Sequence, residues 1–145
     1  EFAKGANEGV TIGLDLSLAM LEQCKANIYK AKARNVLLIR ANAGNLPFKE
    51  GSLSRVYLGC LHLVKDVDLC LASAYRVLAP GGILLGMTFF PSGKVIWRKI
   101  QRLLLKLIYS RPFDKATLQE RMVKTGFSDF QCNPRSYGQF RAVKH

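Results

Sequence analysis

Short apolar runs alternate with longer amphipathic stretches along most of this chain. The runs over residues 10–14, 36–39, 56–63 and 83–90 are brief and rich in branched side chains, which favours buried strands. Between these runs, apolar residues recur at every third or fourth position, as they do on one face of a helix. The pattern therefore predicts an α/β fold in which a mostly parallel sheet is flanked by helices.

The first two predicted helices have recognisable start and end signals. The first begins after Asp15 or Ser17, either of which can cap it, and the second begins at Asp66 and ends at the turn 80–82 (Pro-Gly-Gly). The first helix is expected to bury a face made of Met20, Leu21, Cys24, Ile28 and Ala31. The second is expected to bury Val67, Leu69, Cys70, Ala74, Val77 and Leu78.

The C-terminal part of the chain completes the alternation. A helix is predicted over 113–125, with Asp114 or Thr117 as its start signal and Gly126 just past its end. Two further β-rich runs follow it, around residues 127–132 and 137–143.

Composition narrows the class of protein. Of the 145 residues, 49% are hydrophobic, which is enough to bury a core and excludes a disordered polycation. No apolar run approaches the roughly 18 residues of a membrane span. The cysteines (Cys24, Cys60, Cys70 and Cys132) form no CxxC pair and only two histidines accompany them, so we expect no structural zinc site. Free, mostly buried thiols in a reducing intracellular compartment are the expectation.

The net charge of +12 is concentrated towards the C-terminus. Residues 1–90 carry 10 Lys and Arg against 7 Asp and Glu, a net of +3, whereas residues 91–145 carry 12 against 3, a net of +9. The pattern over residues 94–110 predicts a basic amphipathic helix. We consider three roles for it: a packed helix with a solvated basic face, a lid over a substrate pocket, or a helix on a membrane surface with Trp97 and Tyr109 at the interface. Nucleic acid is a less favoured partner, because no RNA-binding motif accompanies the charge.

Polar or small residues follow three of the predicted strands, where ligands bind in an open α/β sheet. Asp15 can accept hydrogen bonds from both hydroxyls of a ribose, or it can simply cap the following helix. Asn42 precedes small residues that could leave a slot for a purine ring, although a surface turn would have the same composition. Gly59 permits close approach of a ligand, and nearby His62 is either structural or a proton acceptor.

Taken in order, these segments resemble the class I S-adenosylmethionine-dependent methyltransferases, in the broad small-molecule group. The resemblance covers residues 10–90, about half of the chain. It rests on GLDLSLAML (13–21), ANAGNLPF (41–48), GSLSRVYLGCLHLVKD (51–66) and YRVLAPGGILLGMTF (75–89). It implies a Rossmann-like fold and S-adenosylmethionine as the cofactor. The plastid-targeted methyltransferases of plants look similar around Leu61-His62, which implies a plastid location as an alternative to the cytoplasm.

The resemblance also implies roles for individual residues. Asp15 would bind the ribose and Leu16 would lie beside the adenine; Asn42 and Ala43 would hold the adenine edge, and Gly59 and Cys60 would line the methionine portion. At position 42 the family commonly has Asp, and the neutral Asn is expected to weaken that contact by roughly 1 kcal/mol. His62 is the one plausible general base, required only if the methyl acceptor must lose a proton.

One family feature has no counterpart in the sequence, because no GxGxG motif occurs in it. In the family, that loop and the first strand precede the region that residues 1–9 resemble, and the first strand lies between the second and the fourth. We therefore expect a single, N-terminally truncated domain over 1–145, with a cofactor-binding half over 10–90 and the basic helix, last helix and C-terminal strands over 91–145. Such a chain is expected to bind S-adenosylmethionine poorly by itself.

Three functions from different classes follow from these observations. The first is S-adenosylmethionine-dependent methyl transfer to a small molecule, with an apolar acceptor as one version. The second is a non-catalytic interaction protein that retains the fold, and the third is a basic module that binds membranes or nucleic acid. The acceptor atom and the oligomeric state have no signature in the sequence.

Overall fold

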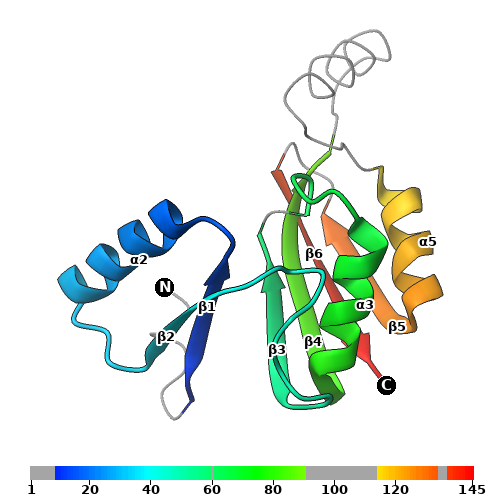
Figure 1. Cartoon of the computed structure of the whole chain (residues 1–145). Coiled ribbons are helices and arrows are strands. Elements are labelled where there is room, and N and C mark those ends of the chain that lie inside the picture. The colour runs from blue at the N-terminus through cyan, green and yellow to red at the C-terminus, as the bar shows by residue number, and fades with distance from the viewer. Residues whose placement is uncertain (1–8, 60, 91–113, 134–136) are drawn as a thin grey trace, which may run out of the picture. The chain divides into compact units, whose positions relative to one another are not determined.

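The structure is a computed structural model that describes residues 9–59, 61–90, 114–133 and 137–145 (Figure 1). The chain divides into two compact units, Glu1–Pro47 and Phe48–His145. The predicted basic helix over 94–110 and residue Cys60 lie outside the described residues.

The first unit is a strand–helix–strand motif. Strand β1 (Thr11–Asp15) leads into helix α2 (Leu18–Lys30), and the chain returns through strand β2 (Val36–Arg40). The two strands pair in parallel, in the register that places Thr11 opposite Val36 and Asp15 opposite Arg40. The two strands and the helix predicted from the hydrophobic pattern are therefore confirmed.

The capping residue of α2 is Ser17 rather than Asp15. Its extended backbone (ψ 117°) precedes the helix, and its hydroxyl accepts a hydrogen bond from the Met20 amide at 3.4 Å. Of the two capping residues that the sequence allowed, Ser17 is therefore the one used, and Asp15 does not cap the helix.

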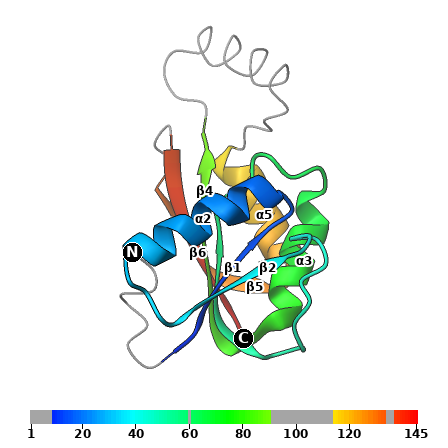
Figure 2. The same cartoon turned by 60° about the vertical axis from the view of Figure 1, so that its left-hand side comes forward.

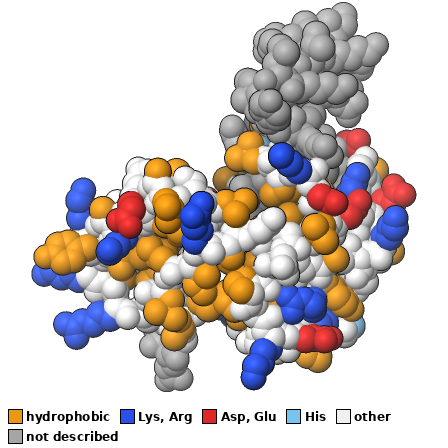
Figure 3. Space-filling view, in the orientation of Figure 1, with side chains coloured by type: hydrophobic (Ala, Val, Ile, Leu, Met, Phe, Trp, Pro, Cys, Tyr) orange, Lys and Arg blue, Asp and Glu red, His pale blue; other side chains and the backbone are white. Residues whose placement is uncertain are grey.

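Apolar side chains of the first unit are more exposed than the sequence predicted. No residue of α2 is buried: Leu21, Cys24 and Ile28 are partly exposed, whereas Met20 is 53% exposed and Ala31 is exposed, so the prediction was wrong for these two. Leu37 on β2 was also expected to be buried and is 56% exposed. Figure 3 shows apolar side chains open on this unit among lysines and arginines.

The second unit contains a four-stranded sheet in the order β3-β4-β6-β5. Its strands are β3 (Leu53–Leu58), β4 (Leu78–Phe89), β5 (Phe127–Asn133) and β6 (Tyr137–Lys144). The β3–β4 pairing is parallel, and β6 runs antiparallel to both β4 and β5. Together with the first unit, this arrangement confirms the Rossmann-like α/β class, with equal numbers of parallel and antiparallel pairings in the described sheets.

Helices α3 (Val67–Val77) and α5 (Lys115–Thr125) cover one face of this sheet (Figures 1 and 2). Their predicted caps are confirmed: Asp66 accepts from the Leu69 amide at 3.0 Å, and Asp114 accepts from the Thr117 amide at 2.8 Å. Gly126 ends α5 with a φ of 105°, a conformation that favours glycine. The core between helices and sheet includes Val56, Leu58, Leu71, Ala74, Val77, Leu84, Leu118, Met122, Phe140 and Ala142.

Three predicted boundaries and one predicted core residue were wrong in this unit. Strand β4 begins at Leu78 instead of residue 83, so the segment 80–82 that was expected to precede it lies within the strand. The third strand runs from Leu53 to Leu58 instead of 56–63, and Leu61 is buried from a turn, so its apolar character does not require a strand. Helix α3 ends at Val77, three residues before Pro80. Leu69 is 53% exposed, because the face of α3 that packs inward carries Leu71 in its place.

Of the three described cysteines, only Cys70 lies in the core. Cys70 is buried as expected, whereas Cys24 and Cys132 are partly exposed, and none of these three cysteines forms a disulfide. The described ranges contain no group of side chains arranged to hold a metal ion, and none of their helices is long and apolar enough to cross a membrane. Within the same ranges, β1 and β3 are both edge strands, and these are the strands for which the resemblance predicts a missing neighbour.

Candidate functional site

The parallel pairing of β1 and β2 brings four of the predicted cofactor-binding residues to one edge of the first unit. Asp15 is the last residue of β1, and the Ala41 amide just beyond β2 donates a hydrogen bond to the Asp15 carbonyl at 3.2 Å. Leu16 follows Asp15 directly, and Asn42 and Ala43 follow Ala41. The register alone therefore places these predicted residues side by side.

The Asp15 carboxylate is held in place and retains binding capacity. Its Oδ1 atom accepts a hydrogen bond from the Ser17 amide at 2.8 Å. In the described part of the chain, no hydrogen bond or ion pair involves Oδ2. An ionised carboxylate with one oxygen anchored and the other open is suited to accepting a hydroxyl group of a ligand.

Leu16 combines an anchored backbone with an open side chain. The Arg40 side chain donates from Nε to the Leu16 carbonyl at 2.9 Å, which ties the segment after β1 to the end of β2. The Leu16 side chain is 59% exposed. An exposed leucine on a tethered backbone can cover one face of a planar ligand.

Asn42 is oriented by the turn that follows it. Its Oδ1 atom accepts a hydrogen bond from the Gly44 amide at 2.9 Å, and its carbonyl accepts one from the Asn45 amide at 2.9 Å. The predicted contact with an adenine amine would therefore use the second lone pair of Oδ1, while the Nδ2 amide remains a donor. Gly44 is buried beneath this turn.

Gly59 directly follows β3 in the second unit, and the Tyr57 ring occupies the space beside it where a side chain would lie. A Cβ atom at position 59 would lie 3.0 Å from Cε1 of Tyr57. Tyr57 is 43% exposed at this strand end. The sequence analysis did not predict the contact between Tyr57 and Gly59. The signal for it was their spacing of two residues, because residues two apart along a strand lie on the same face.

His62 is half-buried in the turn after β3. Its Nδ1 atom is buried and has no hydrogen-bond partner among the described residues, and desolvation lowers the pKa of the imidazole from its ordinary value of 6.5. The ring is therefore neutral at physiological pH and able to accept a proton. The structure thus groups Asp15, Leu16, Asn42 and Ala43 in one unit and holds Gly59 and His62 in the other.

The lowered pKa of His62 predicts a pH dependence of stability. As the pH falls below about 6.5, the unfolded chain takes up a proton at this histidine while the folded chain resists it, so the free energy of unfolding should decrease. Urea unfolding between pH 7.5 and 5.5 should show this decrease, and His62→Gln should reduce it. His145→Gln, which replaces an exposed histidine, is the matched control and should reduce the decrease less than His62→Gln does. An unchanged slope in His62→Gln would show that the buried imidazole does not govern the dependence.

Comparison with known proteins shows that the chain is similar to methyltransferases. The family model of the methyltransferase domain matches residues 2–86. An uncharacterized chloroplastic methyltransferase of Arabidopsis thaliana is 34% identical over 114 residues, which are 73% of this chain and 32% of the plant protein. A demethylmenaquinone methyltransferase of Listeria welshimeri is 42% identical over 78 residues, 53% of this chain and 33% of that enzyme. The chain thus spans about a third of the length of these relatives.

Solved structures share the fold at low sequence identity. A Methanosarcina mazei S-adenosylmethionine-dependent methyltransferase superposes with a TM-score of 0.79 at 16% identity, covering 97% of this chain and 85% of its own. A Haemonchus contortus phosphoethanolamine N-methyltransferase, solved with S-adenosylhomocysteine, superposes with a TM-score of 0.75 at 19% identity, covering 97% and 45%.

Proposed function

This chain belongs to the methyltransferase domain family, and from that premise we propose that it binds S-adenosylmethionine and forms part of an enzyme that methylates a small, apolar acceptor. The observation that carries the proposal is the adjacency of Asp15 and Asn42 at the ends of two parallel strands. One strand end offers an open carboxylate oxygen and the next an oriented amide, which suits a ribose and the purine attached to it.

The residues of the first unit would bind and orient the nucleoside part of the cofactor. Asp15 would accept the ribose hydroxyls, Leu16 would cover the adenine ring, and Asn42 would contact the polar edge of the adenine. Hydrogen bonds from Ser17, Arg40 and Gly44 already hold these three residues, so little ordering is required on binding. The cofactor itself supplies the methyl group, activated on a sulfonium sulfur.

The second unit would contribute to the acceptor side of the reaction. The neutral imidazole of His62 can take a proton from an acceptor hydroxyl, provided that the acceptor needs to lose one. The demethylmenaquinone methyltransferases among the relatives support an apolar, quinone-like acceptor. The excess of cations over 94–110 supports contact of this segment with a membrane surface, where such an acceptor would dissolve.

A titration of the ¹⁵N-labelled chain with S-adenosylhomocysteine, followed by NMR, tests the cofactor proposal. Amide resonances of Leu16, Ala43 and Gly44 should shift, with a dissociation constant weaker than low micromolar because no glycine-rich loop is present in the sequence. Adenosine should shift the same resonances, and 2′,3′-dideoxyadenosine, which lacks the ribose hydroxyls, should bind more weakly. The proposal fails if saturating ligand leaves these resonances unmoved or if the two nucleosides bind equally.

A further inference from the structure

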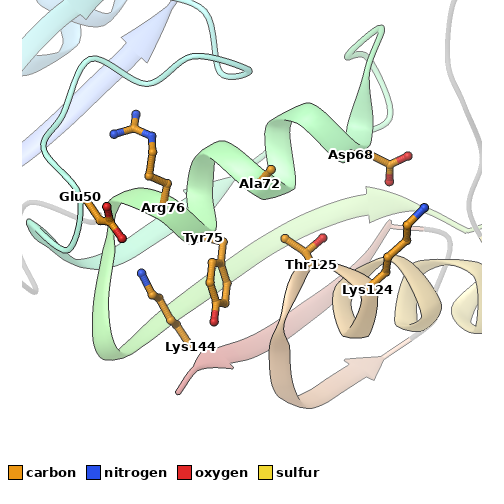
Figure 4. Close-up of a pocket in the computed structure, with 8 residues that line it drawn as sticks. All are labelled: Glu50, Asp68, Ala72, Tyr75, Arg76, Lys124, Thr125 and Lys144. Atoms are coloured by element: carbon orange, nitrogen blue, oxygen red, sulfur yellow. The ribbon is translucent and has the colours of Figure 1, made fainter.

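A hollow of about 430 Å³ on the second unit has no part in the proposed methyl transfer (Figure 4). It lies between α3, α5 and the end of β6, and cationic side chains from all three elements line it. We propose that this hollow binds a small oxyanion, such as phosphate or a phosphate monoester, with the ammonium of Lys144 as its principal contact.

Lys144 is the observation that points to an anionic ligand. The residue is only 8% exposed, and its ammonium lies 4.7 Å from the centre of the Tyr75 ring. No described residue forms an ion pair or a hydrogen bond with that ammonium. An ammonium carries three hydrogen-bond donors and a full charge, so an anion that enters the hollow meets donors that no described residue occupies.

The other charges around the hollow leave this positive charge uncompensated. Asp68 is already ion-paired with Arg121 at 2.6 Å. Arg76 and Lys124 lie in the last turns of α3 and α5, where cations offset the negative ends of the helix dipoles. Lys144 belongs to a strand and has no such role. Glu50 is then the one acid of the lining that competes with an incoming anion.

The Tyr75 ring that the Lys144 ammonium contacts is packed against Phe127 and Gly126. The Tyr75 ring packs edge-on against Phe127, with 5.0 Å between the ring centres and 87° between the ring planes. Gly126 lies against the same ring, because a Cβ atom there would be 3.0 Å from the Tyr75 hydroxyl. The aromatic ring beside the ammonium is therefore held in place before a ligand binds.

The end of the hollow that holds Lys144 and Glu50 lies at the opposite end of β3 from Gly59 and His62. Glu50 precedes the amino end of β3, and Lys144 follows the Ile83–Val143 pair near the start of the regular part of β4. The six residues of β3 span about 20 Å, which separates Lys144 and Glu50 from the strand end that carries Gly59. A ligand in the hollow therefore occupies a second site.

Phosphate titration of the chain at constant ionic strength tests this proposal. Added phosphate should shift the NMR signals of Tyr75 and Thr125 and raise the melting temperature, whereas chloride at equal ionic strength should do neither. Methyl phosphate, sulfate and acetate then distinguish a phosphate monoester, an inorganic oxyanion and a carboxylate as the preferred ligand. Equal effects of phosphate and chloride would overturn the proposal.

Charge variants assign the site to these residues. Lys144→Gln should abolish phosphate binding, and Lys124→Gln, which alters an exposed side chain, should weaken it about three- to tenfold. Glu50→Gln should tighten binding, because it removes the competing carboxylate. Lys115→Gln, on the same helix as Lys124 but at its other end, is the matched control and should bind as the parent does. If Lys144→Gln does not fold, weaker phosphate binding in Lys124→Gln together with tighter binding in Glu50→Gln would support the proposal. Equal phosphate affinities of Lys124→Gln and Lys115→Gln would refute it.

Discussion

Asp15→Asn is expected to weaken the binding of S-adenosylhomocysteine by about 10- to 100-fold, because a hydrogen bond to a charged group contributes roughly 1.5–3 kcal/mol. Asparagine retains an oxygen that can accept the Ser17 amide now bound at 2.8 Å, so the turn after β1 should survive. It replaces the open Oδ2 with an amide that donates, which leaves a ribose hydroxyl without its acceptor.

The measurement is the dissociation constant from the NMR titration, made for the parent chain and for Asp15→Asn. Glu22→Gln removes one negative charge from the exposed surface of α2 and serves as the matched control for net charge. A loss of less than twofold in Asp15→Asn, or an equal loss in Glu22→Gln, would show that the carboxylate does not contact the ribose. Unchanged melting temperatures would confirm that both variants are folded.

Gly86→Ala is expected to lower the free energy of unfolding by about 3 kcal/mol, because the core at that position has no room for a methyl group. Gly86 lies in β4 between Leu58 of β3 and Phe140 of β6. A Cβ atom there would be 2.7 Å from the Leu58 carbonyl oxygen and 2.6 Å from Cε1 of Phe140. The carbonyl belongs to the backbone of a paired strand and cannot move without breaking the pairing.

Gly81→Ala is the control that measures the cost of replacing a glycine where no side chain or backbone atom would clash with the new methyl group. Gly81 has a φ of 74°, but a Cβ atom there would have no neighbour within 4 Å. Its replacement should cost about 1 kcal/mol, through backbone strain alone. Urea unfolding followed by circular dichroism compares the two variants. Similar losses in both would contradict the packing argument, whereas partial recovery in Gly86→Ala with Phe140→Leu would support it.

Local signals in the sequence were sufficient for most of the secondary structure of the second unit. Asp66, Asp114 and Gly126 determine helix ends through contacts with their own neighbours, and these ends are as predicted. The strand over 56–63 was misjudged, because burial of Leu61 from a turn produces the same apolar run as a strand. The apolar character of a residue predicts that it is buried. It does not predict whether the residue lies in a strand or a turn, because the backbone conformation also depends on the packing of the rest of the chain.

The candidate site divides in the same way. The local pattern of residues was enough to predict which residues stand at the ends of strands, since Asp15 and Asn42 both follow apolar runs. The folded chain was needed to show that parallel pairing brings these two strand ends together, that Ser17 and not Asp15 caps the helix, and that Tyr57 fills the space beside Gly59. It also revealed Lys144 buried over Tyr75, from residues 69 positions apart. Contacts of this kind depend on register and on long-range packing, which no local pattern of residues encodes.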